Sequence, residues 1–144
     1  MFSKSCQYAL QAILYITLHS KNGSTVGLKE IAASQKIPIH FLSKILQNLV
    51  KHKILASTKG PNGGFVLNKS PNRLKLIKIV EITDGLDIFD LCGIGLKVCS
   101  DDTPCPIHFE YKVVKNKTKE LLNTKTVSEL CEDVEKGQSI VTYK

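Results

Sequence analysis

The sequence predicts a mainly α-helical fold with one small β-hairpin and a long helix near the C-terminus. Three observations predict it. Apolar residues recur at helical spacing through residues 5–51, two short β-rich runs flank the glycine-rich stretch 60–64, and a heptad-like apolar repeat runs from Ile107 to Leu121. The chain has 144 residues, which is about one domain with one hydrophobic core.

Three helices are predicted in the first third of the chain. Residues 5–20 carry an apolar face at helical spacing. Gly27 can cap a short second helix that begins at Leu28, and a break ending in Pro38 opens a third helix over residues 38–51. This is the order of a helix-turn-helix.

The third helix has two chemically distinct faces. Its inner face carries Leu42, Ile45, Leu46 and Leu49 at positions i, i+3, i+4 and i+7. Its outer face is polar and basic without any acid, and consists of His40, Ser43, Lys44, Gln47 and Lys51. Such a face suits the major groove of DNA.

A β-hairpin is expected directly after the third helix. The β-rich runs 54–58 and 65–67 flank Gly60-Pro61-Asn62-Gly63-Gly64, which has strong turn chemistry. The glycines would let this hairpin approach DNA closely, and Lys59 adds charge. The predicted fold class is therefore a winged helix-turn-helix plus a long C-terminal helix, which by its heptad-like pattern is either a dimerisation helix or a core helix of a single chain.

The second half of the chain alternates between helix and an irregular loop. A helix is predicted over residues 73–83, and Asp84-Gly85 ends it. The irregular loop that follows is long for a compact domain, and loops of this length usually have a function. Thr126 and Glu129 form a capping box for a last short helix. The expected divisions are 1–86 (DNA-binding), 87–106 (cysteine-rich sensor loop), 107–131 (dimerisation helix and short capping helix) and 132–144 (polar tail).

Charge is distributed unevenly along the chain. Residues 1–80 hold twelve Lys or Arg against one acid, a net +11, whereas residues 81–144 hold eight against twelve, a net −4. A basic front half indicates a polyanion partner, and with the helix-turn-helix that partner is double-stranded DNA. Arg73 is the only arginine, so lysines would contact phosphates and smaller polar side chains would read bases.

Other function classes fit the sequence less well. No apolar run has transmembrane length and no export signal is evident, so we expect a cytoplasmic protein without a membrane partner. A small redox or metal-handling enzyme is disfavoured, because no nucleophile has an adjacent base and no substrate pocket signature is present; we expect no small-molecule substrate. A scaffold that binds protein through the winged helix stays open, and its binding would not fall steeply with salt.

The loop holds the chemical centre of the sequence. Three cysteines and a histidine follow the pattern Cys92-x6-Cys99-x5-Cys105-x2-His108. Thiolates converging from one loop can hold a soft metal, and the alternatives are a zinc site with these four ligands or a thiol switch without metal. Five cysteines, an odd number, argue against a disulfide framework. Cys6 and Cys131 lie on apolar helical faces, where buried small side chains are expected.

Several short motifs match one known family along nearly the whole chain. They are Tyr8-Ala9-Leu10, Leu28-Lys29-Glu30-Ile31-Ala32, Phe41-Leu42, Ile45-Leu46, the stretch from Leu55 to Leu67, Ile79-Val80 and Asp84-Gly85. The sequence thereby resembles the Rrf family of bacterial winged-helix regulators. One departure is that six residues separate Cys92 from Cys99, where the cluster-binding members usually have five.

The resemblance implies a set of functional residues. It implies a homodimer on a palindromic operator, with activity switched by a 2Fe-2S or 4Fe-4S cluster that senses redox state, iron or nitric oxide. The implied cluster ligands are Cys92, Cys99, Cys105 and His108. The predicted DNA-binding residues are Lys29, Pro38, His40, Ser43, Lys44, Gln47, Lys51, Lys59, Gly60, Asn62 and Gly63. The predicted dimer seam is Ile107, Tyr111, Val114, Thr118 and Leu121, spaced 4-3-4-3.

Overall fold

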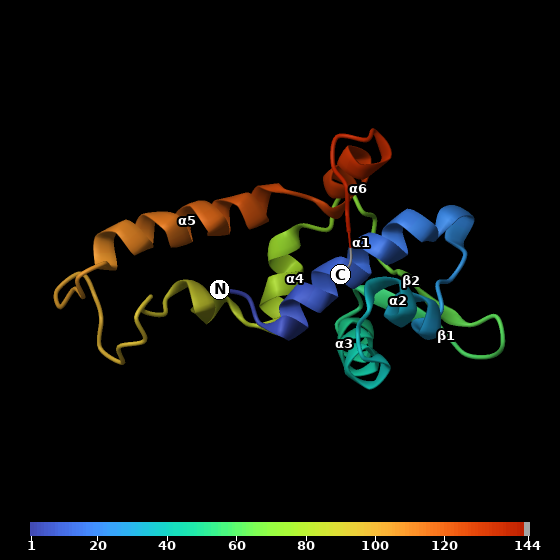
Figure 1. Ribbon diagram of the computed structural model, residues 1–144, viewed down its shortest axis with the longest axis horizontal. Helices are drawn as coiled ribbons and strands as arrows, with labels where there is room; N and C mark the ends of the chain where they lie inside the picture. Colours follow the sequence, from blue (N-terminus) through green and yellow to red (C-terminus); the bar gives the residue numbers. More distant parts are fainter. Residues whose placement is uncertain (143–144) are drawn as a thin grey trace.

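The computed structural model describes residues 1–142 and is mostly helical with one two-stranded antiparallel hairpin. Figure 1 shows an elongated molecule with the hairpin turn at one end and the cysteine-containing loop at the other. The elements in chain order are α1 (Lys4–His19), η1 (Lys21–Gly23), α2 (Leu28–Gln35), α3 (Ile39–Lys51), β1 (Leu55–Thr58), β2 (Gly64–Leu67), α4 (Leu76–Thr83), η2 (Leu86–Phe89), α5 (His108–Thr124) and α6 (Val127–Glu135). The predicted fold class is confirmed.

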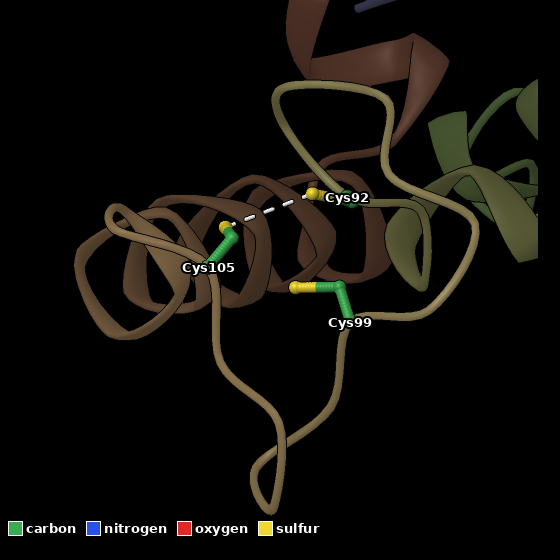
Figure 2. A group of neighbouring side chains, drawn as sticks. All are labelled: Cys92, Cys99 and Cys105. Atoms are coloured by element: carbon green, nitrogen blue, oxygen red, sulfur yellow. Dashed lines mark hydrogen bonds between the residues drawn. The ribbon is translucent and has the colours of Figure 1, made fainter.

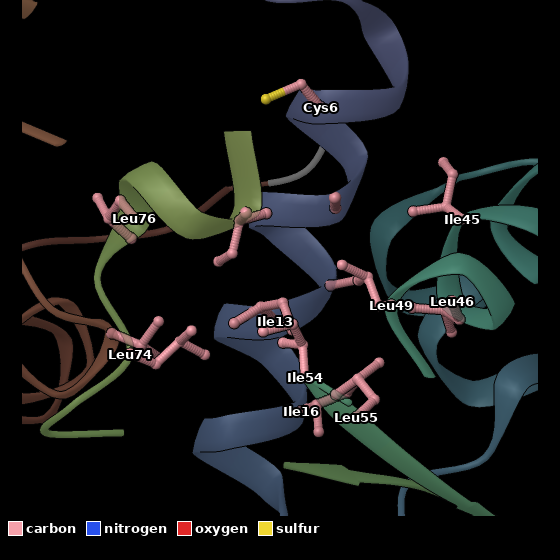
Figure 3. Close-up of a cluster of buried hydrophobic side chains, with 14 of the residues drawn as sticks. Cys6, Ile13, Ile16, Ile45, Leu46, Leu49, Ile54, Leu55, Leu74 and Leu76 are labelled. Carbon is pink, nitrogen blue, oxygen red and sulfur yellow. The ribbon is translucent and has the colours of Figure 1, made fainter. Parts of the chain in front are cut away.

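Helix α1 is the centre of the hydrophobic core. The Ser3 hydroxyl accepts a hydrogen bond from the Cys6 N–H and so caps the helix. Ile13 and Ile16 are almost fully buried in the middle of α1, with side chains of α3 on one side and Leu74 and Leu76 on the other (Figure 3). Helices α2, α3, α4 and α6 all contact α1, so one core holds the winged helix together.

Helices α2 and α3 form the predicted helix-turn-helix. Gly27 caps α2 as expected, and α2 ends at Lys36, whose left-handed backbone (φ 56°) turns the chain. Pro38 is the N-cap of α3. The four predicted inner-face residues of α3 are all buried, from 0% to 6% exposed. Burying four large aliphatic side chains, at about 1.5–3 kcal/mol each, fixes which face of α3 is left for a partner.

The hairpin is tied to the helical core at its base and near its tip. Leu55 pairs with Leu67 and Thr58 with Gly64 across the two strands. Val26 and Phe65 exchange two backbone hydrogen bonds of 2.8 Å. The Thr25 hydroxyl donates to the Asn62 carbonyl oxygen at 3.0 Å. The wing therefore has a fixed position relative to α2 and α3.

Two glycines in the wing are required by its geometry. A Cβ atom at Gly63 would lie 2.1 Å from the Thr58 carbonyl oxygen, and one at Gly64 would lie 2.5 Å from the Val26 carbonyl oxygen. Both clashes are with backbone atoms, which cannot rotate away. A larger residue at Gly63 would distort the hairpin turn itself, and one at Gly64 would push the wing away from Val26.

Helices α4 and α6 differ in length from the prediction. Helix α4 begins at Leu76 rather than at residue 73, because the backbone of Leu74 and Leu76 is hydrogen-bonded to the α5–α6 connection: the Val127 N–H donates to the Leu74 carbonyl at 2.9 Å. The Thr126–Glu129 capping box is confirmed. Helix α6 runs to Glu135, four residues past the expected end. Of the predicted tail, residues 143–144 lie outside the described residues.

Helix α5 projects from the body of the protein (Figure 1). Its seventeen residues bury only Lys115 and Leu122, whereas Phe109, Val113, Val114 and Leu121 are each more than half exposed. The loop 90–107 leads away from α4 and η2 to the far end of the molecule, and α5 then runs back toward the body of the protein. No helix within residues 1–142 is long and apolar enough to cross a membrane.

Candidate functional site

The outer face of α3 and the wing enclose an open groove of about 370 Å³. Ser43 and Gln47 of α3 face it from one side, and Lys59 and Gly63 of the wing face it from the other. The Gln47 amide donates to the Ser43 hydroxyl at 3.3 Å. Four of the predicted DNA-binding residues, from two successive elements, thus line one surface.

The other seven predicted DNA-binding residues do not line this groove. Lys44 faces a second hollow, on the side of α3 that packs toward the start of α1. Lys44 is exposed, and so are the remaining six, which line neither hollow: Lys29, Pro38, His40, Lys51, Gly60 and Asn62. Side chains that touch solvent here are free to contact a large partner.

This surface is basic almost without compensation. Glu30 is the only acid in residues 1–80. Its carboxylate accepts a hydrogen bond from the Tyr15 hydroxyl at 3.0 Å. The lysines around the groove therefore keep a positive potential, which attracts the phosphates of a nucleic acid.

The three loop cysteines meet at one point although up to twelve residues separate them. The Sγ atoms of Cys92, Cys99 and Cys105 all lie within 4.8 Å of one another. Figure 2 shows their side chains pointing toward a common centre beside α5. The Sγ atoms of Cys92 and Cys105 are 3.7 Å apart. Cys105 is buried, and the other two are half-buried.

The loop favours a thiolate at Cys92. Backbone N–H groups of Ile94 and Leu96 donate to the Cys92 sulfur and lower the pKa of its thiol to about 7. Burial raises the pKa of the neighbouring Cys105 thiol. Thiolates are the form that binds metal or attacks an oxidant, so Cys92 is prepared for either chemistry at neutral pH.

The two remaining cysteines lie in the hydrophobic core, as expected. Cys6 is 0% exposed and Cys131 is 7% exposed. Burial raises the pKa of both thiols, that of Cys131 to about 11. They stay protonated at neutral pH and take no part in the cysteine centre.

His108 reaches the centre through Cys99. Its Nδ1 lies 3.1 Å from the Cys99 sulfur, and its Nε2 lies 2.8 Å from the Asp101 carboxylate. Lys112 donates to both oxygens of the same carboxylate, at 2.8 Å and 2.6 Å. Hydrogen bonds from Lys112 and then from His108 hold the pKa of Asp101 below its ordinary value. Sequence reasoning missed Asp101, although its place between Cys99 and Cys105 was visible.

Two further contacts fasten the loop to α5. The Lys115 ammonium is buried and donates to the Leu91 carbonyl, next to Cys92, at 2.8 Å. The Tyr111 ring packs so closely on Gly93 that a Cβ atom there would lie 2.8 Å from the ring. Lys115 was also missed, because a lysine off an apolar seam is usually solvated.

A third contact ties the other end of this region to α1. The Asp84 carboxylate, at the end of α4, accepts hydrogen bonds from the Ser3 N–H at 2.8 Å and from the Ser3 hydroxyl. Gly85 follows with φ 79°, a left-handed conformation that suits glycine, and leads into η2. The start of α1 and the approach to the cysteine loop are therefore joined.

The residues of the predicted dimer seam fall on two sides of α5. Ile107, Val114 and Leu121 are exposed, by 39%, 51% and 55%. Tyr111 and Thr118 are half-buried, on the side that carries Lys115 and Leu122. Ile107, Val114 and Leu121, seven positions apart, are therefore not buried by other parts of the same chain within residues 1–142.

The donor set at the cysteine centre fits a soft metal or an iron–sulfur group. Three thiols converge and the pKa of one of them is lowered to about 7. The imidazole nitrogen of His108 lies beside Cys99 but does not come within 4.8 Å of all three sulfurs. A hollow of about 320 Å³ borders Cys92 and Cys99. Neither Cys105 nor His108 lines this hollow, so the fit rests on the ligand chemistry of the converging thiols.

Comparison with known proteins identifies the relatives of this chain. Residues 2–133 match the Rrf2 family, described as an iron-dependent transcriptional regulator. An HTH-type transcriptional regulator of Aquifex aeolicus (strain VF5) is 32% identical over 138 residues, covering 94% of each chain. The HTH-type transcriptional regulator IscR of Pectobacterium carotovorum is 30% identical over 129 residues, covering 90% of this chain and 77% of the relative.

Solved structures share the fold. T. potens IscR superposes with a TM-score of 0.74 at 24% identity, covering 99% of this chain and 94% of the other. CymR, the global cysteine regulator of B. subtilis, superposes with a TM-score of 0.73 at 20% identity, covering 92% and 96%. The relatives are regulators of transcription and not enzymes. With its exposed recognition helix, its wing and its cysteine triad, this chain belongs to the Rrf2 family of winged-helix, DNA-binding transcriptional regulators.

Proposed function

We propose that this regulator is a homodimer that binds a palindromic operator and that an iron–sulfur cluster on Cys92, Cys99 and Cys105, with His108 as fourth ligand, controls its DNA affinity. The observation that carries the proposal is the convergence of the three cysteine sulfurs within 4.8 Å in the loop between the winged helix and α5. Because its target is DNA and its relatives are bacterial, we infer that it acts in the cytoplasm.

In the proposed complex with DNA, some side chains read base edges and others contact phosphates. His40, Ser43 and Lys44 on the first turns of α3 would read base edges in the major groove. Lys29, Lys51 and Lys59 would contact phosphates, and the ammonium group of Lys44 would contact a phosphate next to the base edge that it reads. The glycine-rich wing, with little side chain at its tip, would follow the minor groove.

In the proposed sensor, the chain's own residues hold and orient the ligands. The N–H groups of Ile94 and Leu96 stabilise the Cys92 thiolate, and Lys115 fixes the backbone next to it. When bound, the cluster would supply reversible one-electron chemistry and reactivity toward oxygen or nitric oxide. If the cluster were lost, the loop would be held less firmly against α5.

Control of DNA binding then depends on how the loop is attached. One end is fastened to α5 through Lys115 and Tyr111, and the other approaches α1 through the Asp84–Ser3 pair. A rearranged loop would shift α5 relative to α4 and α1. In a dimer built on α5, that shift would change the distance or tilt between the two copies of α3.

The exposed apolar side of α5 supports the dimer. Changing Val114 and Leu121 to Asp is expected to convert a dimer of twice 15.9 kDa into a monomer, because buried unpaired carboxylates oppose association. Sedimentation equilibrium measures the mass. The matched control is Asn116→Asp with Asn123→Asp, which adds the same charge at two exposed positions on the opposite side of α5. A Val114→Asp/Leu121→Asp protein that stays dimeric would place the interface elsewhere.

Two alternatives use the same residues without a cluster. A zinc ion could take three thiolates and one imidazole in tetrahedral geometry. A thiol switch is favoured by one contact, the 3.7 Å separation of the Cys92 and Cys105 sulfurs, together with the low pKa of the Cys92 thiol. Either alternative keeps the DNA-binding function.

Metal analysis combined with an absorption spectrum tests the cluster. Protein purified or reconstituted without oxygen is expected to be brown, to contain iron and inorganic sulfide, and to bleach in air or nitric oxide. A protein that stays colourless and iron-free after reconstitution would rule the cluster out. Zinc in that protein would then support the zinc site, and absence of both metals would support the thiol switch.

A further inference from the structure

The Asp101 carboxylate lies directly behind His108, on the side of the ring that faces away from the cysteines. Asp101 belongs to the turn between Cys99 and Cys105. The Thr103 N–H donates to the Ser100 hydroxyl at 3.2 Å, and the Ser100 N–H donates to the Thr103 carbonyl at 3.3 Å. This turn holds Asp101 against the first turns of α5, where His108 and Lys112 are one helical turn apart.

The contacts of the carboxylate determine the role of each ring nitrogen. A carboxylate only accepts hydrogen bonds, so His108 must donate to Asp101 through its Nε2–H at 2.8 Å. A neutral imidazole carries one proton, so Nδ1 keeps a free electron pair. That nitrogen is the one that lies 3.1 Å from the Cys99 sulfur. The His108 side chain is only 13% exposed, which limits exchange of these partners with water.

We propose that Asp101 is a positioning residue for His108: its carboxylate selects the imidazole form protonated on Nε2 and leaves Nδ1 directed at the cysteine centre to bind iron. This inference rests on the proposed cluster. Metal-binding histidines generally donate their second nitrogen to a carboxylate, carbonyl or water, and removing that partner weakens metal binding by roughly 10- to 100-fold. Lys112 holds the carboxylate in position by donating to both of its oxygens.

A purely structural role for Asp101 makes a different prediction. If the Asp101–Lys112 ion pair only closed the turn, its loss would affect the loop without a preference for either ring nitrogen. Asp101→Asn separates the two roles. Lys112 would still donate to the amide oxygen, which turns the NH2 group toward His108 and forces Nε2 to accept. His108 would then carry its proton on Nδ1, the nitrogen that should bind metal.

The first test uses the metal-free protein, so it does not depend on a cluster. Nitrogen-15 NMR of the imidazole groups at about pH 8, where an ordinary histidine is neutral, reports which nitrogen is protonated. We expect the Nε2–H form of His108 in the wild type and the Nδ1–H form in Asp101→Asn. The same form in both proteins would overturn the proposal.

The second test uses the anaerobically reconstituted protein. Transfer of iron to a chelator is expected to be roughly 10- to 100-fold faster in Asp101→Asn than in the wild type. The matched control is Asp102→Asn, because Asp102 is exposed, loses the same charge and makes no hydrogen bond or ion pair within the described residues. In a His108→Ala background, Asp101→Asn should have no further effect. Asp101→Glu should restore part of the wild-type rate.

These tests separate failure of this inference from failure of the cluster proposal. If the wild-type protein binds no iron, the cluster proposal is wrong. The NMR experiment on the metal-free protein still tests whether Asp101 selects the protonated nitrogen of His108. A wild type that holds iron, with Asp101→Asn and Asp102→Asn releasing it at equal rates, overturns the role of Asp101 alone. An equal effect of Asp101→Asn with and without His108 does the same.

Discussion

Replacing Lys44 and Lys59 with alanine is expected to weaken DNA binding roughly a thousandfold at 0.15 M salt, because a dimer loses about four phosphate contacts. Each contact releases about 0.9 counterion, so the plot of log affinity against log salt should become shallower by roughly 3.6. Lys44 and Lys59 are exposed. Their removal should therefore leave the folded structure intact.

Fluorescence anisotropy with a duplex of about thirty base pairs, titrated at several salt concentrations, measures both quantities. The operator is not needed, since phosphate contacts also carry non-specific binding. Lys136→Ala is the control for loss of an exposed lysine outside this surface. Lys136 is an exposed lysine at the end of α6, which lies across α1 from α3 in Figure 1. An unchanged salt slope in the double variant would contradict the proposed DNA contacts and favour protein binding by this surface.

The winged helix could be predicted from sequence because its signals are local. The spacing of Leu42, Ile45, Leu46 and Leu49 identifies the buried face of α3, and a single chain segment contains the whole pattern. The signal of the wing is local as well, because Gly63 is required by the carbonyl group of Thr58, only five residues away. Local patterns such as these need no knowledge of the remaining fold.

Features that depend on distant segments could not be predicted. Helix α4 starts late because Leu74 and Leu76 pair with the α5–α6 connection about fifty residues further along. The apolar spacing on α5 does not separate burial in the same chain from burial in a partner, and the structure divides the seam between Tyr111 and Thr118 on one side and exposed Val114 and Leu121 on the other.

In the candidate site, too, the local pattern could be predicted and the contacts between distant residues could not. The cysteine pattern predicts which residues can gather, and all three sulfurs do meet. It does not predict the support around them. Lys115 reaches the loop across twenty-four residues, and Asp101 turns back onto α5. Both act through tertiary contacts, which residue spacing does not encode.

Replacing each of the three loop cysteines with serine is expected to abolish cluster binding in all three variants. A serine hydroxyl has nearly the size of a thiol but does not ionise at neutral pH, so it cannot replace a thiolate ligand. After anaerobic reconstitution, iron, sulfide and visible absorption should fall to background in Cys92→Ser, Cys99→Ser and Cys105→Ser. The DNA affinity of each variant should no longer change on exposure to air or nitric oxide.

Cys131→Ala is the control for a cysteine outside the centre. It should lower the melting temperature slightly, because it removes a buried side chain, but it should bind the wild-type amount of iron. Loss of iron from this variant as well would mean that the serine variants report damage to the fold and not loss of ligands.

The pattern across the three variants separates the cluster from the thiol switch. A cluster needs all three thiolates, so its loss should silence the response equally in each variant. A disulfide needs only the pair whose sulfurs are 3.7 Å apart, Cys92 and Cys105. Under the thiol switch, Cys99→Ser would therefore keep its response to oxidation, and the other two variants would lose it. A responsive, iron-free Cys99→Ser protein would replace the cluster with a Cys92–Cys105 disulfide as the controlling chemistry.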